Sequence, residues 1–143
     1  MAVFQLLYAS GGARQITTAD IDDILEKSRR NNAALGVTGM LLFADNMFIQ
    51  VLEGEERDVR DLARRISRDQ RHRNFMELIE QTSPERAFAR WQMGFKRLQP
   101  DQPEDMVVFK ASRDALAGRI SPRDGGLMME TVMAFAGRDF LAA

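Results

Sequence analysis

The fold is decided by residues 37–53, whose sequence is VTGMLLFADNMFIQVLE. Two runs of β-favouring apolar residues flank the short turn signal Asp45-Asn46, so the stretch predicts a β-hairpin with strands over 37–43 and 47–53. Side chains of a strand alternate between its two faces, and both of these strands are apolar on both faces. We therefore expect both sides of the sheet to be covered by other parts of the chain.

The segments on either side of this hairpin predict an α+β fold. They are, in chain order, a strand over 3–9 ended by Ser10-Gly11-Gly12, a helix from the capping-box pair Thr17 and Asp20 to about Asn31-Asn32, a helix with the apolar stripe Val59, Leu62, Ala63 and Ile66, and strands over 75–81 and 91–95. The order βαββαββ is typical of a ferredoxin-like sandwich, with two helices on one face of a mixed five-stranded sheet. After a linker over 99–103, helices predicted over 104–116 and 128–135 are expected to cover the other face.

The composition narrows the function classes. A net charge of -1 gives no global field that would favour nucleic acid or an anionic membrane. The absence of cysteine excludes disulfides and thiolate catalysis, and a single histidine, His72, argues against a histidine metal cluster or a Ser-His-Asp triad. With so few cysteine and histidine ligands, we expect no metal site. No apolar run approaches the length of a membrane span, and no signal peptide is evident, so we expect a cytoplasmic protein.

Gln50 is a polar amide in the middle of an apolar strand. A buried amide without partners costs about 1–3 kcal/mol, so either the protein or a bound ligand must satisfy it. Tyr8 could meet Gln50 on the floor of a groove between the two predicted helices. The walls of this groove would carry Ile24, Ser28 and Asn31 or Asn32 from the first helix, and Leu62, Arg65, Ile66 and Asp69 from the second. Such a groove suits a flat, amide-edged heterocycle with an anionic tail.

Five sequence blocks occur in order along the chain. They are Tyr8-Ala9-Ser10, Asn31-Asn32, Leu35-Gly36-Val37-Thr38-Gly39-Met40-Leu41, Phe48-Ile49-Gln50-Val51-Leu52-Glu53-Gly54 and Trp91-Gln92-Met93. Together they resemble the BLUF domain, a blue-light sensor that uses FAD, over roughly residues 2–98. The resemblance implies a flavin-binding domain over 1–98 and a helical extension over 99–143 that packs on the sheet.

The resemblance also implies a role for each site residue. Gln50 would bridge the flavin and Tyr8, and Tyr8 would donate an electron and a proton to the excited flavin. Around them, Asn31 and Asn32 would bind the edge of the isoalloxazine, Ile24, Phe48 and Ile66 would pack near the ring, and Arg65, Asp69 and His72 would meet the phosphate and adenosine part. Trp91 and Met93 would relay the change through the last strand.

Each of these residues also has a plainer interpretation. One of Asn31 and Asn32 is expected to be a helix C-cap, since Asn tolerates the left-handed conformation. Arg65 and Asp69, four residues apart, are most often a solvated ion pair. On spacing alone, His72 is a surface residue, and Trp91 and Met93 are core residues. The joint pattern favours the flavin site.

Three functions remain in competition. The chain ends where an output domain would start, so we expect a stand-alone photoreceptor without catalytic activity. Its signal would pass to a separate effector protein, or through a homodimer or higher homo-oligomer. The enzyme alternative is an acylphosphatase-like hydrolase, in which Gly11, Gly12 and Arg14 would hold a phosphate. The third possibility is a BLUF-derived interaction module that no longer binds flavin.

Overall fold

The protein is built on a five-stranded sheet with strand order β4-β1-β3-β2-β5. A computed structural model describes residues 2–89, 92–99, 101–116, 130–132 and 134. Its elements are β1 (Val3–Gly12), α1 (Thr18–Leu35), β2 (Thr38–Ala44), β3 (Met47–Gly54), α2 (Glu56–Ser67), β4 (His72–Ser83), β5 (Gly94–Arg97) and α3 (Pro103–Leu116). Neighbouring strands are antiparallel except β2 and β5, which are parallel. The predicted α+β, ferredoxin-like sandwich with a mixed sheet is confirmed.

The β2–β3 hairpin forms as predicted, with Asp45 and Asn46 at its turn. Both have positive φ angles, 49° and 60°, as a two-residue type I′ turn requires. Gly39 of β2 is required by the close approach of the two strands, because a Cβ there would lie 2.0 Å from the carbonyl oxygen of Val51. The hairpin thereby holds Leu41 directly across from Gln50.

Helix α1 begins as predicted but ends later. Thr17 and Asp20 form a complete capping box at its N-terminus. The predicted end near Asn31-Asn32 is wrong, and so is the assignment of one of these residues as the C-cap. Good helix formers continue the helix to Leu35, and Gly36, with φ 67° and ψ 28°, is the left-handed cap. Asn31 and Asn32 therefore lie inside the helix, and neither of them caps its C-terminus.

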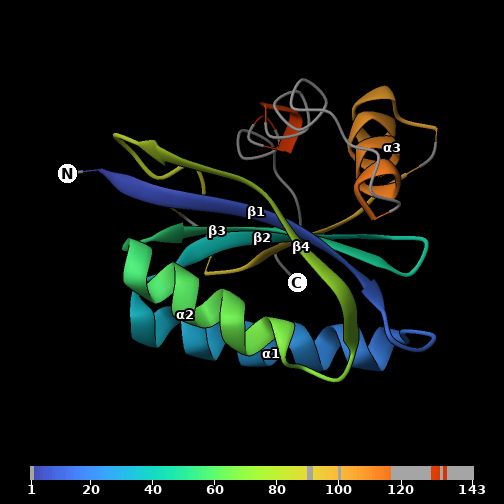
Figure 1. The fold of residues 1–143 in the computed structure, drawn as a ribbon, viewed down its shortest axis with the longest axis horizontal. Helices are drawn as coiled ribbons and strands as arrows, with labels where there is room; N and C mark the ends of the chain where they lie inside the picture. Colours follow the sequence, from blue (N-terminus) through green and yellow to red (C-terminus); the bar gives the residue numbers. More distant parts are fainter. Residues whose placement is uncertain (1, 90–91, 100, 117–129, 133, 135–143) are drawn as a thin grey trace.

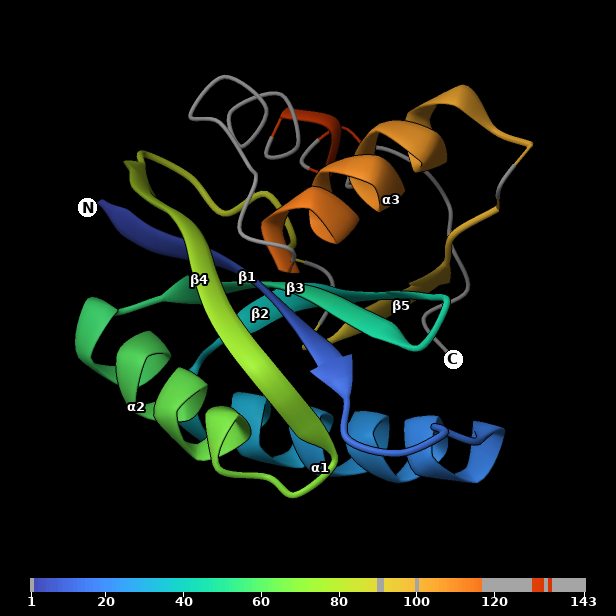
Figure 2. The ribbon, with the colours of Figure 1, turned by 45° about the vertical axis from the view of Figure 1, so that its right-hand side comes forward.

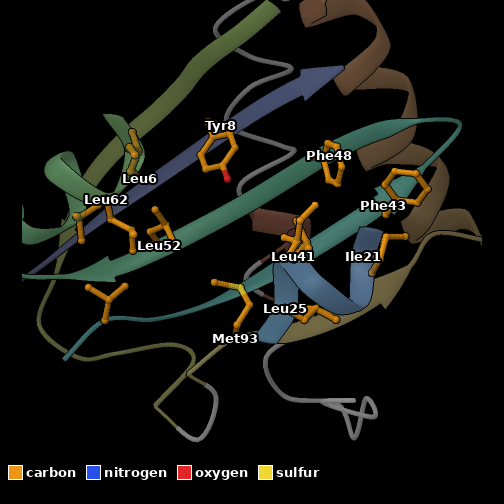
Figure 3. Packing of buried hydrophobic residues seen from close by; sticks show 14 of the residues in the cluster. Leu6, Tyr8, Ile21, Leu25, Leu41, Phe43, Phe48, Leu52, Leu62 and Met93 are labelled. Carbon is orange, nitrogen blue, oxygen red and sulfur yellow. The ribbon is translucent and has the colours of Figure 1, made fainter. Parts of the chain in front are cut away.

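The sheet is covered on both faces, as Figures 1 and 2 show: α1 and α2 lie on one side and α3 on the other. The face under α1 and α2 carries Leu6, Tyr8, Leu41, Phe48 and Leu52, all of which are labelled in Figure 3. The opposite face carries Leu7, Ala9, Met40, Ile49 and Val51, which cluster with Val108 and Ala111 of α3 and with Val132. The strict alternation of these two sets puts Tyr8 and Gln50 on the face covered by α1 and α2.

Several predicted boundaries move. β1 runs through the expected breaker Ser10-Gly11-Gly12, because β4 begins at His72 rather than at residue 75 and pairs with Gly12. β5 covers Gly94–Arg97 instead of 91–95. Trp91 lies outside the described residues, as does most of the helix predicted over 128–135, of which 130–132 and 134 are helical.

Candidate functional site

A groove opens between α1 and α2 above the sheet. It is lined by Tyr8, Ile24, Lys27, Ser28, Asn31, Leu41, Gln50, Leu62, Arg65, Ile66, Asp69, Arg71 and His72. The floor comes from three adjacent strands and the walls from the two helices and the turn after α2. Nine of the predicted site residues are thus brought together in one place.

Tyr8 and Gln50 form the centre of the groove floor. They lie directly across from each other on β1 and β3, and both are buried. The Gln50 amide Nε2 donates a hydrogen bond to Met93 Sδ at 3.2 Å. The Tyr8 hydroxyl is buried and has no hydrogen-bond partner among the described residues. Burial, reinforced by the negative charge of Asp69, raises the pKa of Tyr8 well above its usual value, so the phenol is neutral.

Figure 3 shows the Tyr8 ring above the sheet on the same side as Leu41 and Met93. The ring packs on Phe75 of β4 with centroids 4.3 Å apart, and this contact fixes its plane. Tyr8 therefore has a ring that is held by packing and a hydroxyl that forms no hydrogen bond with any described protein group. A buried hydroxyl of this kind is expected to meet a ligand.

Asn32 and Phe48 do not line the groove, contrary to their predicted place in the site. Asn32 is buried and its Nδ2 donates to the carbonyl of Gln92, while its Oδ1 has no partner among the described residues. Phe48 packs between the rings of Phe43 and His72, at centroid distances of 5.2 and 4.6 Å. The amide of Asn32 still offers one free acceptor, whereas Phe48 supports the site through His72.

The charged end of the groove is organised differently from the prediction. Asp69 lies in the turn after α2, and it pairs with Arg71 at 2.8 Å rather than with Arg65. Arg71 also contacts Asp23 of α1 at 2.9 Å. Hydrogen bonds from Arg71 lower the pKa of Asp69 to about 2, so this carboxylate is ionised. Arg65 is exposed and takes part in no ion pair of the described part of the chain.

His72 is half-buried at the start of β4 and belongs to the groove, so its interpretation as a surface residue is wrong. Its Nδ1 lies 2.7 Å from the Ser10 hydroxyl. Burial lowers the pKa of His72 to about 4, which makes the ring neutral near pH 7. A neutral imidazole at this position can both accept and donate hydrogen bonds.

Three further residues line the groove that were not predicted there: Lys27, Leu41 and Arg71; Leu62 lies on the groove wall as predicted. Helical spacing could have found Lys27, three residues after Ile24. Hairpin register could have found Leu41, opposite Gln50. No local signal marks Arg71, whose position depends on the turn between α2 and β4.

Residues 3–94 match the family model for BLUF, sensors of blue-light using FAD. The chain is 32% identical over 102 residues to the blue light- and temperature-regulated antirepressor BluF of Escherichia coli (strain K12), covering 71% of this chain and 25% of that protein. It is 33% identical over 113 residues to the photoactivated adenylate cyclase subunit beta of Euglena longa, covering 78% of this chain and 13% of that protein. The chain thus spans a quarter or less of these curated relatives.

Solved structures of similar length agree with the fold. The photo-activated state of BlsA superposes with a TM-score of 0.75 at 28% identity, covering 93% of this chain and 95% of that chain. The dark-state structure of BlrB, a BLUF protein, gives a TM-score of 0.73 at 29% identity, covering 92% of this chain and 96% of that chain. Within the part of the chain that the structure describes, no helix is long and apolar enough to cross a membrane.

Proposed function

Because the chain belongs to the BLUF family of blue-light sensors that use FAD, we propose that it is a photoreceptor whose groove between α1 and α2 holds FAD and whose Tyr8 and Gln50 respond to light. The observation that carries this proposal is the direct cross-strand pairing of a buried amide with a buried hydroxyl that lacks a partner among the described residues. FAD supplies the absorption of blue light and, once excited, the capacity to take an electron.

The residues of the groove fit this cofactor. Two buried polar atoms lack partners in the described part of the chain: Tyr8 Oη in the groove, and Asn32 Oδ1 on α1, outside the groove lining. A bound ligand with amide and carbonyl edges can satisfy such groups. Asn31 stands on the groove wall and would hold the ring edge together with Asn32. Ile24 of α1 and Ile66 of α2 both line the groove and would pack against a flat ring, and Ser28 of α1 lines it too.

The phosphate and adenosine part would lie at the charged end. Arg65 has no ion-pair partner among the described residues and is available to an anion. Asp69 and His72 line the same end of the groove, where Asp69 also fixes Arg71. An arginine can hold a phosphate with two parallel hydrogen bonds, which favours this end for the anionic tail.

Tyr8 would act as the electron donor. Its phenol is neutral at rest because burial raises its pKa. Removal of an electron makes a phenolic proton strongly acidic, so Tyr8 would give up its electron and its proton together and recover both on return. The packing of its ring on Phe75, at 4.3 Å, would keep the hydroxyl in place during this cycle.

Gln50 would keep the effect of light as an altered pattern of hydrogen bonds around its side-chain amide. Its Nε2 and Oε1 are a donor and an acceptor of similar size, so rotation or tautomerisation of the amide reverses its hydrogen bonds and hardly alters the packing. Nε2 donates to Met93 Sδ at 3.2 Å, so a turned amide would change its contact with the residue that precedes β5. Met93, and Trp91 two residues before it in sequence, would relay the change through β5.

The output is proposed to be a change in partner binding or in contacts between copies of the chain. α3 lies on the sheet face opposite the groove and is joined to β5 by the buried ion pair Lys96–Asp105, at 3.1 Å. We therefore propose residues 1–98 as the flavin-binding unit and 99–143 as an extension that transmits its state to a separate effector or a homo-oligomer. In this proposal the chain is a sensor and not an enzyme.

The acylphosphatase-like alternative has little support from the geometry. Its phosphate-binding arginine would be Arg14, and the Arg14 guanidinium is held by both carboxylate oxygens of Asp20, at 2.6 and 2.8 Å. Gly11 and Gly12 lie within β1 rather than in a loop. The hydrolase would also leave the Tyr8–Gln50 pair without a role.

The deciding experiment is an absorption spectrum of the purified protein before and after blue light, followed in the dark. We expect a flavin spectrum that shifts slightly to the red on illumination and recovers thermally. A colourless protein, or a flavin that only bleaches, would contradict the proposal. The same measurement on Gly39→Ala provides a negative control, because a methyl group there would collide with the Val51 carbonyl and force apart β2 and β3, the strands that carry Leu41 and Gln50.

A further inference from the structure

The two residues that precede β5 are held from helix α1. The parallel pairing of β5 with β2 begins at Gly94, which lies opposite Met40, so the ladder does not reach residues 92 and 93. The carbonyl of Met93 accepts two hydrogen bonds from Arg29, from Nε at 3.0 Å and from Nη2 at 2.9 Å. The carbonyl of Gln92 accepts one from Asn32. Two α1 side chains, three residues apart on one helix face, thus hold two successive carbonyls.

Arg29 differs from Arg60 and Arg71, the two other partly buried arginines among the described residues. It is half-buried, and burial lowers its pKa. The ion pairs of the described residues include Arg14, Arg60, Arg64 and Arg71, each with a carboxylate, but not Arg29. Two nitrogens of its guanidinium, Nε and Nη2, donate instead to a single oxygen, the carbonyl oxygen of Met93. A partly buried guanidinium that forgoes a carboxylate is costly to keep, which points to a role in placing the segment it binds.

The side chain of Met93 faces the photoactive pair. Met93 is buried, and its sulfur is the acceptor for Gln50 Nε2. A thioether is a weak acceptor on a flexible stem, so this contact depends on where the main chain of Met93 is placed. Arg29 fixes that main chain through the carbonyl oxygen, while Gln50 contacts the side chain through the sulfur. Figure 3 shows Met93 close to the α1 segment that carries Leu25.

We propose that Arg29 is a positioning residue of the light response: it holds the Met93 carbonyl so that the Met93 sulfur stays within reach of the Gln50 amide, and it links α1 to the state of Gln50. This inference rests on the proposed function only in taking Gln50 as the group that light changes. It predicts that loosening the Arg29 fork moves Met93 without emptying the groove, since Arg29 does not line it.

The test uses the full, flavin-loaded chain and two readouts. The first is the carbon-13 methyl resonance of Met93 in the dark, assigned with Met93→Leu among the nine methionines of the chain. The second is the rate of dark recovery after blue light. Arg29→Gln removes the fork, Arg29→Lys retains a cation and one donor direction, and Arg30→Gln is the matched control, an exposed arginine next in sequence. Arg29→Met keeps the apolar stem and replaces Arg29→Gln if that variant does not fold.

We expect Arg29→Gln to shift or split the Met93 resonance and to change the recovery rate at least threefold. Arg29→Lys should return the rate to within twofold of the unmodified protein, and Arg30→Gln should change neither readout. An unchanged Met93 resonance in Arg29→Gln overturns the positioning role, and a moved resonance with an unchanged recovery rate overturns the link to Gln50. If the unmodified protein shows no light-induced shift, the proposed function fails, while the resonance still tests the hold on Met93.

Discussion

Replacing Tyr8 with phenylalanine should make the flavin-free protein more stable while it abolishes the light response. The Tyr8 hydroxyl is buried and lacks a partner among the described residues, and such a group costs about 1–3 kcal/mol. Tyr8→Phe removes the hydroxyl and keeps the ring on Phe75. We therefore expect the free energy of unfolding of the flavin-free protein to rise by about 1–2 kcal/mol, or the melting temperature by roughly 3–8 °C.

The assay is thermal unfolding of both proteins with and without FAD, together with the absorption change on illumination. The gain should shrink in the flavin-loaded protein, because there the hydroxyl is expected to have a partner. Tyr8→Phe should retain flavin and lose the red-shifted state. Phe75→Leu serves as the control, because it removes the ring contact but keeps the hydroxyl, and it should be destabilising yet retain the shift.

Two results would refute this reasoning. A flavin-free Tyr8→Phe variant that is less stable by more than about 1 kcal/mol would mean that the hydroxyl has a protein partner after all. A normal red-shifted state in Tyr8→Phe would mean that another group donates the electron. The two results are independent, since the first concerns the packing of the groove and the second its photochemistry.

Three other predictions concern single groups. Gln50→Leu should retain flavin and lose the red-shifted state, and a persistent shift in its absorption difference spectrum would assign the response to another hydrogen-bonding group. His72 has a pKa of about 4 in the native state against 6.5 in an unfolded chain, so the unfolded state binds more protons between these two values. The free energy of unfolding should therefore fall as the pH drops through this window, by at most about 1.4 kcal/mol per pH unit. The urea midpoint should fall less between pH 7 and 4.5 in His72→Gln than in the unmodified protein, and an equal fall in both would contradict this. Lys96→Met leaves the buried Asp105 carboxylate without its cation and should lower the free energy of unfolding, measured by chemical denaturation, by about 3–5 kcal/mol. The double variant Lys96→Met/Asp105→Leu should recover part of this loss. A loss below about 1 kcal/mol in Lys96→Met would show that the ion pair does not hold α3.

The elements that could be predicted are those with local causes. The hairpin follows from two apolar runs and a turn whose Asp45 and Asn46 accept positive φ. The start of α1 follows from the Thr17–Asp20 capping box. Boundaries moved where a distant partner decided them: β1 continues through Gly12 because β4 pairs with it.

The residues of the site also divide into those that local sequence patterns could place and those that distant contacts place. Tyr8, Asn31 and Gln50 could be placed in one groove from strand alternation, helical spacing and a family resemblance. The role of Asn32 could not, because its amide donates to the carbonyl of Gln92, which lies 60 residues later in the chain.

The sequence by itself determined the order of elements, the two-sided sheet and the placement of Tyr8, Asn31 and Gln50 in one groove, because these depend on spacing along one strand or helix. Only the tertiary structure decided that Arg71 rather than Arg65 holds Asp69, and that Arg29 and Gln50 both form hydrogen bonds with Met93. Contacts of this kind depend on how helices and turns pack across the sheet, and that packing is set by the sum of many buried side chains rather than by any local pattern.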